Sequence, residues 1–166
     1  MRRLLHLPNI WKSHMIPVEI KRRLLETLVW PIATYGSEAW TMSKVDERRI
    51  EAFEMKTLRR MLQVHWSTHT TNDAVLERAG TQRKLLHSIK KRRLRYIGHT
   101  LRRPSALQAI IATGMIPGTN RRGRPRTTWH DNTKTWTGLT LTEQIRTAAD
   151  RSSWSDVVMS VAQGLF

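Results

Sequence analysis

The sequence predicts an all-α protein, because apolar residues recur at helical spacing, capping residues mark the ends of these runs, and no segment alternates convincingly with the period of a strand. Of the 166 residues, 39% are hydrophobic, which is enough to bury a core. We expect an irregular array of helices. Its predicted parts are a flexible lead-in (1–15), a helical domain (16–103), a basic linker rich in Gly, Pro and Arg (104–126) and a small C-terminal helical subdomain (127–166).

The first helix is expected to begin at Pro17, because the first turn of a helix does not need the amide hydrogen that proline lacks. Ile20, Leu24 and Leu28 follow at intervals of four and predict an apolar side on this helix. Pro31 should kink or end the helix.

The second helix is expected to start after Ser43 as N-cap and to run to about Gln63. Its first turn is acidic, which suits the positive end of a helix dipole. Ile50, Leu58 and Met61 fall on one side at 100° per residue, while cations gather on the other. These cations are Arg48, Arg49, Lys56, Arg59 and Arg60.

A short third helix is expected between a cap at Thr71 or Asn72 and a left-handed stop at Gly80. A longer helix should follow from about 82 to 103, where Pro104 stops it.

The remaining helices are expected to be short. One is predicted over 106–112 and another over 127–137. Thr140 and Glu143 have the spacing of a capping box and predict a helix through Ala149. A last helix is predicted over 152–162, with Trp154 and three valines on its buried side.

The distribution of charge is the strongest functional observation. The chain carries 29 Lys and Arg against 13 Asp and Glu, a net charge of +16. Residues 81–126 alone contain 13 of these cations and no carboxylate. Such a block repels itself unless a polyanion lies against it, and nucleic acid is the commonest polyanion. The alternative is a solvated basic face that serves solubility.

Four cations in this block are placed to follow a phosphate backbone. Lys84, Lys91, Arg95 and Arg102 are spaced by 7, 4 and 7, which stacks them along one side of a helix. The stripe would be roughly 27 Å long, comparable to several successive phosphates. The nucleic-acid-binding candidates are Lys84, Lys91, Arg92, Arg95, Arg102, Arg103, Arg121, Arg122, Arg124, Arg126 and Trp129.

Residues 122–125, Arg-Gly-Arg-Pro, match the core of an AT-hook, an extended element whose arginines lie in a narrow A·T minor groove. Two alternatives are a flexible basic linker that contacts phosphate without reading bases, and a nuclear-import signal. Trp129 directly follows this segment, so we expect it to be half exposed and able to stack on a base.

Two charged residues fall on apolar helix faces. Glu54 lies among Ile50, Leu58 and Met61, and Arg93 lies in the apolar arc of the long basic helix. A buried charge needs a partner or a route to water. We therefore predict a Glu54–Arg93 salt bridge between the two helices.

The residue types argue against catalysis. The chain has no cysteine, its carboxylates are scattered, and it has no phosphate-binding glycine loop. His65 and His69 have a metal-ligand spacing but lack an evident third ligand, so we predict no metal, no cofactor and no catalytic residue. We also expect no membrane span and no secretion signal, and a nuclear or cytoplasmic location.

Several short motifs occur in an order that resembles a known family. They are WPIATYGSEAW (30–40), AFEM and LRRML (52–62), TN through LERAG (71–80), RRLRYIGH (92–99), RGRPR with Trp129, and ADR with Trp154. This order resembles the region downstream of the polymerase core in non-LTR (LINE-type, RTE-like) retrotransposon endonuclease/reverse transcriptases. The resemblance covers about residues 21–161.

The resemblance implies that the first helices belong to the thumb that grips the template-primer duplex, and that the rest is a nucleic-acid-binding tail. It supplies no catalytic residue, because the aromatic-x-Asp-Asp motif of the palm is absent from this chain. A partner implied in this way, besides DNA, RNA or their hybrid, is the palm of a reverse transcriptase.

Three hypotheses follow. The first is a reverse-transcriptase-derived fragment that is inert as an enzyme and contacts the nucleic-acid backbone. The second is a retrotransposon remnant with no independent activity. The third is a metal-dependent nuclease that would lose activity in Asp131→Ala.

Overall fold

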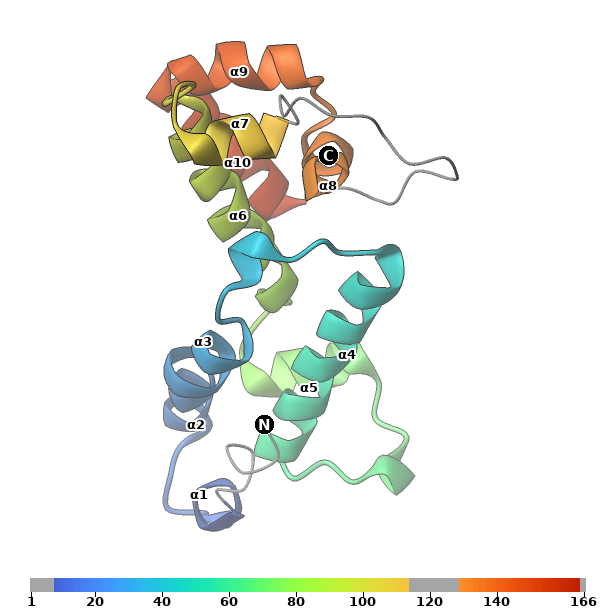
Figure 1. Cartoon of the computed structure of the whole chain (residues 1–166). Coiled ribbons are helices and arrows are strands. Elements are labelled where there is room, and N and C mark those ends of the chain that lie inside the picture. Colours follow the sequence, from blue (N-terminus) through green and yellow to red (C-terminus); the bar gives the residue numbers. More distant parts are fainter. Residues whose placement is uncertain (1–7, 114–128, 165–166) are drawn as a thin grey trace. The chain divides into compact units, whose positions relative to one another are not determined.

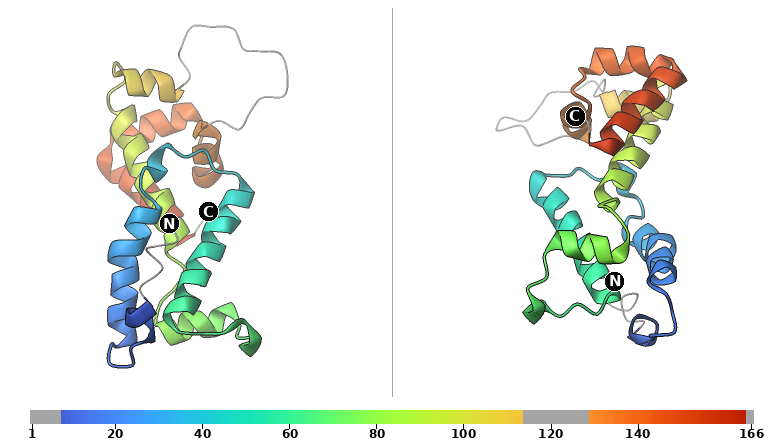
Figure 2. Two further views of the ribbon diagram at one scale, coloured as in Figure 1. Left: turned by 60° about the horizontal axis from the view of Figure 1, so that its bottom comes forward. Right: turned by 180° about the vertical axis from the view of Figure 1, so that it is seen from behind.

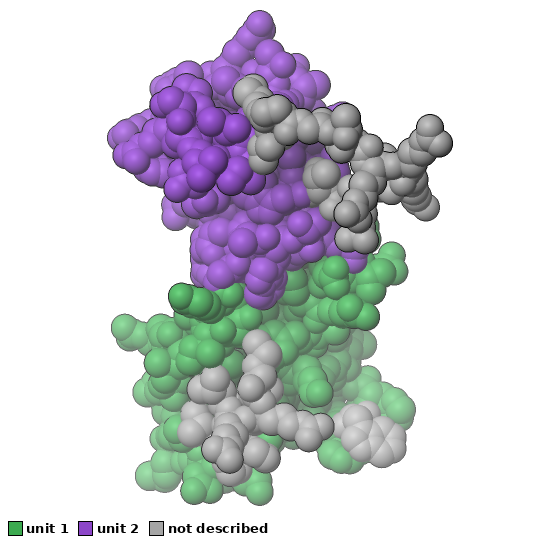
Figure 3. Space-filling model, viewed as in Figure 1, with its two compact units in different colours: residues 1–35, 44–86 green, residues 36–43, 87–166 purple. Residues whose placement is uncertain are grey.

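The computed structural model describes residues 8–113 and 129–164, and every regular element among them is helical. The all-α prediction is therefore confirmed. The chain forms two compact units, which are described separately: unit 1 comprises residues 1–35 and 44–86, and unit 2 comprises residues 36–43 and 87–166 (Figure 3). The boundary between the units at residues 86 and 87 falls inside the long basic helix. The domain limits predicted from sequence composition stay a prediction.

Unit 1 contains α1 (Pro8–Lys12), α2 (Val18–Leu24), α3 (Trp30–Ala33), α4 (Lys44–Met61) and α5 (Asn72–Ala79) (Figure 1). Helix α1 lies within the lead-in that we expected to be flexible, and its Trp11 is buried. The buried Lys21 ammonium joins α2 to this segment, because it donates to the carbonyl oxygens of Trp11 at 2.9 Å and Ser13 at 2.8 Å.

Proline 31 changes the winding of its helix without ending it. The helix continues from α2 to α3 through a π-helical turn, Leu25–Val29, directly before Trp30 and Pro31. A π turn is one way in which a helix accommodates the hydrogen bond that proline cannot donate. Where we predicted a kink or an end of the helix, the structure shows a local change from α-helix to π-helix.

Of the apolar side predicted for the first helix, only Leu24 packs against the core. Ile20 and Leu28 are each about half exposed, whereas Lys21, Leu25 and Val29 face the core. The reason is Lys21, whose position looks polar in the sequence although its ammonium is satisfied by backbone carbonyls and its aliphatic stem is buried.

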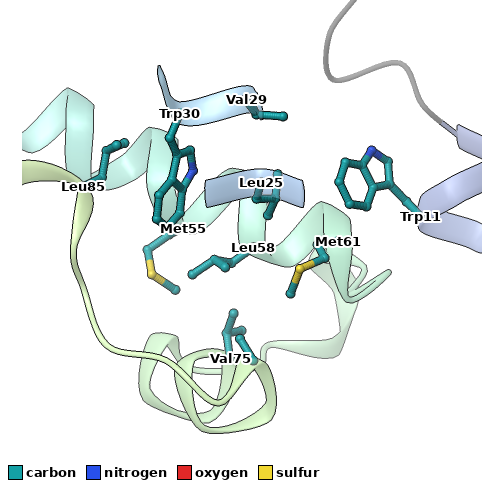
Figure 4. Packing of buried hydrophobic residues seen from close by; sticks show 10 residues of the cluster. Trp11, Leu25, Val29, Trp30, Met55, Leu58, Met61, Val75 and Leu85 are labelled. Carbon is teal, nitrogen blue, oxygen red and sulfur yellow. The ribbon is translucent and has the colours of Figure 1, made fainter. Parts of the chain in front are cut away.

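The core of unit 1 gathers side chains from all of its long segments (Figure 4). Leu58 and Met61 of α4 are buried as predicted, and they pack with Leu25, Val75 and Trp11. Helix α4 begins directly after Ser43 and ends at Met61, two residues before the predicted end.

The third helix also follows its prediction. The Thr71 hydroxyl accepts from the amide of Ala74, and Gly80 ends α5 with φ +59°. That left-handed conformation strains any residue with a Cβ, which is why glycine stands there.

Unit 2 contains most of α6 (Leu85–Leu101), followed by α7 (Leu107–Thr113), α8 (Trp129–Thr137), α9 (Leu141–Ala149) and α10 (Arg151–Gln163). Helix α10 packs against α8 and α9, and α7 packs against α8 (Figure 2). The capping box of Thr140 and Glu143 is present as predicted, and Asp150 caps α10.

Close approach of α6 and α10 requires a glycine. A Cβ on Gly98 would lie 2.2 Å from Nε1 of Trp154, and that indole nitrogen donates to the carbonyl of Leu94 at 2.8 Å. The aromatic ring therefore lies directly on the backbone of α6. Two motifs from distant parts of the sequence, RRLRYIGH and ADR with Trp154, thus meet in the interior of unit 2.

Candidate nucleic-acid interface

The predicted cationic stripe is only partly realised on α6. Lys84 precedes the helix, belongs to unit 1 and lies 3.7 Å from the carboxylate of Glu26. Lys91 is half-buried, while Arg95 is exposed and Arg102 is half-buried. The stripe is shorter than its spacing predicts because the long helix starts at Leu85 and not near residue 82.

Arg95 and Arg102 take part in a cationic hollow between α6 and α10, with a volume of about 390 Å³. Arg151, the first residue of α10, joins them, and His99 lies one turn from Arg95 on α6. None of the described residues that line this hollow is acidic. We call these four residues, Arg95, His99, Arg102 and Arg151, the arginine hollow.

Local structure holds this hollow in place. The guanidinium of Arg102 donates to the carbonyl of Ala148 at 3.0 Å, near the C-terminal end of α9. This contact places a cation at the negative end of a helix dipole. The buried side chains of Trp154 and Val158 supply apolar lining to the same hollow. Such an arrangement suits an anion with several oxygens, as a phosphodiester is.

Arg151 is the residue that the sequence did not single out. It lies outside the anion-free block of residues 81–126, and Asp150 precedes it. In the structure the Asp150 carboxylate is engaged elsewhere, since it accepts from Ser152 and Ser153, and these hydrogen bonds lower the pKa of Asp150. No signal in the charge distribution could have placed Arg151 beside α6.

Three other predicted binding residues of unit 2, Arg92, Arg103 and Trp129, do not line the hollow. Arg92 pairs with Glu38 at 3.5 Å, and Arg103 is exposed after the end of α6. Trp129 is half-buried, as expected. The AT-hook-like arginines, Arg121, Arg122, Arg124 and Arg126, lie outside the described residues.

Arg93 has a structural role in unit 2. Its guanidinium lies between two indoles, 4.7 Å from the ring centre of Trp129 and 4.9 Å from that of Trp136. It donates to the carbonyls of Trp40 and Trp129 and to the side-chain oxygen of Asn132. Burial lowers the pKa of Arg93 to about 10, so the side chain stays charged at neutral pH.

Glu54 and Arg93 are both buried as predicted, and each has hydrogen-bond partners in its own unit, while the salt bridge between them stays a prediction. Glu54 Oε1 accepts from the backbone amides of Lys84 at 2.8 Å and Leu85 at 3.0 Å, within unit 1. Each charged group is thus hydrogen-bonded to uncharged groups of its own unit, mainly backbone amides or carbonyls. Periodicity identified the burial correctly, but it could not reveal that backbone groups would serve as partners.

Unit 1 has a second cationic surface, on the side of α4 where the sequence places its cations. A hollow of about 670 Å³ there is lined by cations together with Glu51, which lies 3.7 Å from Arg83. Arg59 is held in position because it donates to the Thr70 carbonyl at 2.7 Å and to Asn72 at 2.9 Å. The cations are Arg48, Lys56, Arg59, Arg60 and Arg83.

Two further observations concern other kinds of site. The described residues contain no group of three or more His, Cys, Asp or Glu side chains placed to bind a metal. Among the described helices, none combines the length and the apolar composition that a membrane crossing requires.

Comparison with known proteins adds one relative. No protein-family model and no solved structure matches the chain. A protein of Caenorhabditis elegans whose name describes it as transposon-derived is 30% identical over 151 residues. The match covers 84% of this chain and 54% of that protein, so the chain spans about half the length of its relative. This distant homology fits a transposon-related origin.

Proposed function

We propose that this chain is a reverse-transcriptase-derived, nucleic-acid-binding fragment that contacts the phosphate backbone through the arginine hollow and does not catalyse a reaction by itself. The proposal starts from homology to a protein named as transposon-derived, about half of whose length the chain spans. The ordered motifs that resemble non-LTR reverse transcriptases supply the more specific origin. The anion-free block of residues 81–126 supplies the positive field.

The single observation that carries the binding proposal is the arginine hollow. It brings three guanidinium groups and an imidazole from α6 and α10 around one surface without an acidic lining residue among those described. Arginine offers paired donors to phosphate oxygens, and such contacts position a nucleic acid without reading its sequence. We therefore expect little sequence preference from this surface.

The test is the salt dependence of binding. Fluorescence anisotropy with labelled duplex DNA, hybrid and single strands gives the affinity at several salt concentrations. If about eight phosphates are neutralised, log K should fall with log salt with a slope of about −7. A slope near zero contradicts the proposal.

A charge-reversal variant assigns this binding to the hollow. The double variant Arg95→Glu/Arg151→Glu changes two exposed residues, and its slope should become shallower by about 2. Arg146→Glu/Arg78→Glu is a matched control, because it makes the same change of charge at exposed positions outside the hollow. If the two double variants lose the same affinity and the same salt dependence, binding depends on net charge alone and not on the hollow.

The second candidate, a remnant without independent activity, is favoured by one observation in unit 1. Ile20, Leu28 and Ile32 are about half exposed, and Tyr35 is 87% exposed, along α2, the π turn and α3. An apolar surface of this kind is typical of a segment that packs against another part of a longer protein. Non-cooperative thermal unfolding with dye binding, and no affinity for nucleic acid, would favour the remnant.

The proposed origin has its own test. The genomic sequence directly upstream of Met1 should encode, in frame, a polymerase core with an aromatic-x-Asp-Asp motif. A stop codon or an unrelated domain in that place contradicts derivation from a complete reverse transcriptase.

A further inference from the structure

Unit 2 has a second pocket, of about 640 Å³, whose lining is mainly apolar and aromatic. It is formed by α6, α7 and the first residues of α8, together with Ala39. We call it the aromatic pocket. Its lining residues are Ala39, Tyr96, Gln108, Ile111, Ala112, Thr113, Trp129 and His130.

Two aromatic rings in this pocket are held in a defined arrangement. Tyr96 and Trp129 meet edge to face, with ring centres 6.3 Å apart and an angle of 85° between the planes. The Trp129 indole nitrogen donates to the carbonyl of Glu38 at 2.7 Å, and the Arg93 guanidinium lies over its ring. Trp129 is therefore fixed, whereas the ring of Tyr96 is 42% exposed and open to a ligand.

His130, which lines the pocket, carries a hydrogen-bonding atom that has no partner among the described residues. Nε2 of His130 is buried and has no hydrogen-bond partner among the described residues. A buried nitrogen of this kind normally has one. Burial lowers the pKa of His130, which keeps the imidazole neutral at pH 7 and able to donate or accept at Nε2. The exposed amide of Gln108 offers a further donor and acceptor.

A ligand that matches this pocket has three properties: flat apolar faces, polar atoms along its edge, and a covalently attached anionic group. The need for an anionic group follows from the basic sequence next to the pocket residues. Between Thr113 and Trp129, both of which line the pocket, lie 15 residues that include four arginines and no carboxylate. A nucleobase on its sugar-phosphate chain meets all three requirements.

We propose that the aromatic pocket binds an unpaired base of single-stranded nucleic acid, with the base stacked on Tyr96 and its polar edge hydrogen-bonded to His130. This inference rests on the proposed function and makes it more specific. It predicts that the chain binds an unpaired segment more tightly than the phosphate contacts alone allow.

The experiment compares three ligands of equal length: a single strand containing 2-aminopurine, the same backbone with abasic sites, and a duplex. Wild-type protein should quench 2-aminopurine fluorescence and bind the base-bearing strand about tenfold more tightly than the abasic strand. Tyr96→Ala should abolish the quenching and this preference, while the affinity for duplex stays within about twofold. Tyr96→Phe keeps the ring and should restore both.

Two further variants test the pocket in other ways, one by filling it and one by removing a hydrogen-bonding atom. Ile111→Trp changes an exposed rim residue to a larger one, so it should block the base without disturbing the core. His130→Phe keeps a ring but removes Nε2. It should lower the affinity for the base-bearing strand and leave the affinity for the abasic strand unchanged. Circular dichroism of each variant checks the fold.

The outcomes separate the two proposals. Two outcomes would contradict the base-pocket proposal and leave backbone binding in place. In the first, duplex binding persists but the abasic strand binds as tightly as the base-bearing strand. In the second, Tyr96→Ala lowers the affinity for all three ligands equally. If the protein binds none of the three ligands, both proposals are wrong. Quenching that survives both Tyr96→Ala and Ile111→Trp places the base elsewhere and also overturns the pocket.

Discussion

Among the described residues, each unit contains a charged side chain that is at most 1% exposed, and the two units stabilise this charge in opposite ways. In unit 1, Glu54 is 1% exposed and accepts from two amides at the start of α6. In unit 2, Arg93 is 0% exposed and donates to two backbone carbonyls and one amide oxygen. Neither of these contacts involves an opposite charge.

The difference lies in what each charge organises. Glu54 satisfies amides that a helix N-terminus leaves without partners, so it acts as a cap supplied by another helix. Arg93 joins α6 to two other segments, because its acceptors belong to Trp40 and to Trp129 and Asn132 of α8, and two tryptophans of α8 enclose its planar head. Glu54 therefore stabilises one helix end, whereas Arg93 connects segments more than 30 residues apart in the sequence.

The largest effect is expected from Arg93→Met. The substitution keeps an apolar stem but removes the Arg93 donor from the part-buried carbonyl oxygens of Trp40 and Trp129, at about 1–3 kcal/mol each. It also removes one donor from the Asn132 side-chain oxygen, which still accepts from the Met42 amide. We expect unit 2 to lose about 3 kcal/mol or more of its free energy of unfolding. Urea unfolding followed by tryptophan fluorescence measures the loss, with a separate probe for each unit because a chain with two compact units need not unfold in a single step.

Arg93→Lys sharpens this test, since lysine keeps the charge but cannot contact three acceptors with a planar fork. The free energy of unfolding of unit 2 in Arg93→Lys should lie between the values for wild type and Arg93→Met. If Arg93→Met changes the stability of unit 2 by less than about 1 kcal/mol, the guanidinium does not hold these segments together.

A smaller effect is expected from Glu54→Gln in unit 1. Glutamine keeps the size and one acceptor oxygen, but it removes the negative charge from the positive end of α6, at a cost of about 1–2 kcal/mol. Hydrogen exchange should show faster exchange at the amides of Lys84 and Leu85. Glu51→Gln is the matched control, because the Glu51–Arg83 pair is partly exposed and contributes less than about 1 kcal/mol.

Equal stability changes in Glu54→Gln and Glu51→Gln would contradict the view that Glu54 caps α6. A large effect of Glu54→Gln on unit 2, with unit 1 unchanged, would contradict the assignment of this contact to unit 1.

The fold was predictable to the extent that local signals determine it. Caps and stops placed α5 and α9 closely, because Thr71, Gly80 and the Thr140 capping box act on neighbouring backbone groups. The predicted start of α4 is also close, since the helix begins directly after Ser43. The packed face of α2 was not predictable from periodicity. It depends on Lys21, whose acceptors belong to the preceding segment.

The candidate site shows the same limit. Residue spacing on one helix correctly related Arg95 to Arg102, because both lie within α6. It could not place Arg151 beside them, since that depends on how α10 packs onto Gly98 through Trp154. It also paired Glu54 with Arg93, because a sequence displays opposite charges but does not display backbone groups as partners.

The smallest effect concerns His130, whose protonation is disfavoured mainly by burial and also by the positive charge of Arg93. Burial lowers the pKa of His130, the Asp131 carboxylate raises it, and the positive charges of Arg93 and Lys134 lower it. Below the ordinary value of 6.5, the unfolded chain therefore binds a proton more readily than the folded one, and stability is lost as the pH falls through this range. The loss between pH 7 and pH 5 should be less than about 1 kcal/mol, because the side chain is only half-buried. Thermal unfolding of wild type and His130→Phe at these two pH values isolates this contribution, and an identical pH dependence in both proteins would show that His130 titrates alike in the folded and unfolded states.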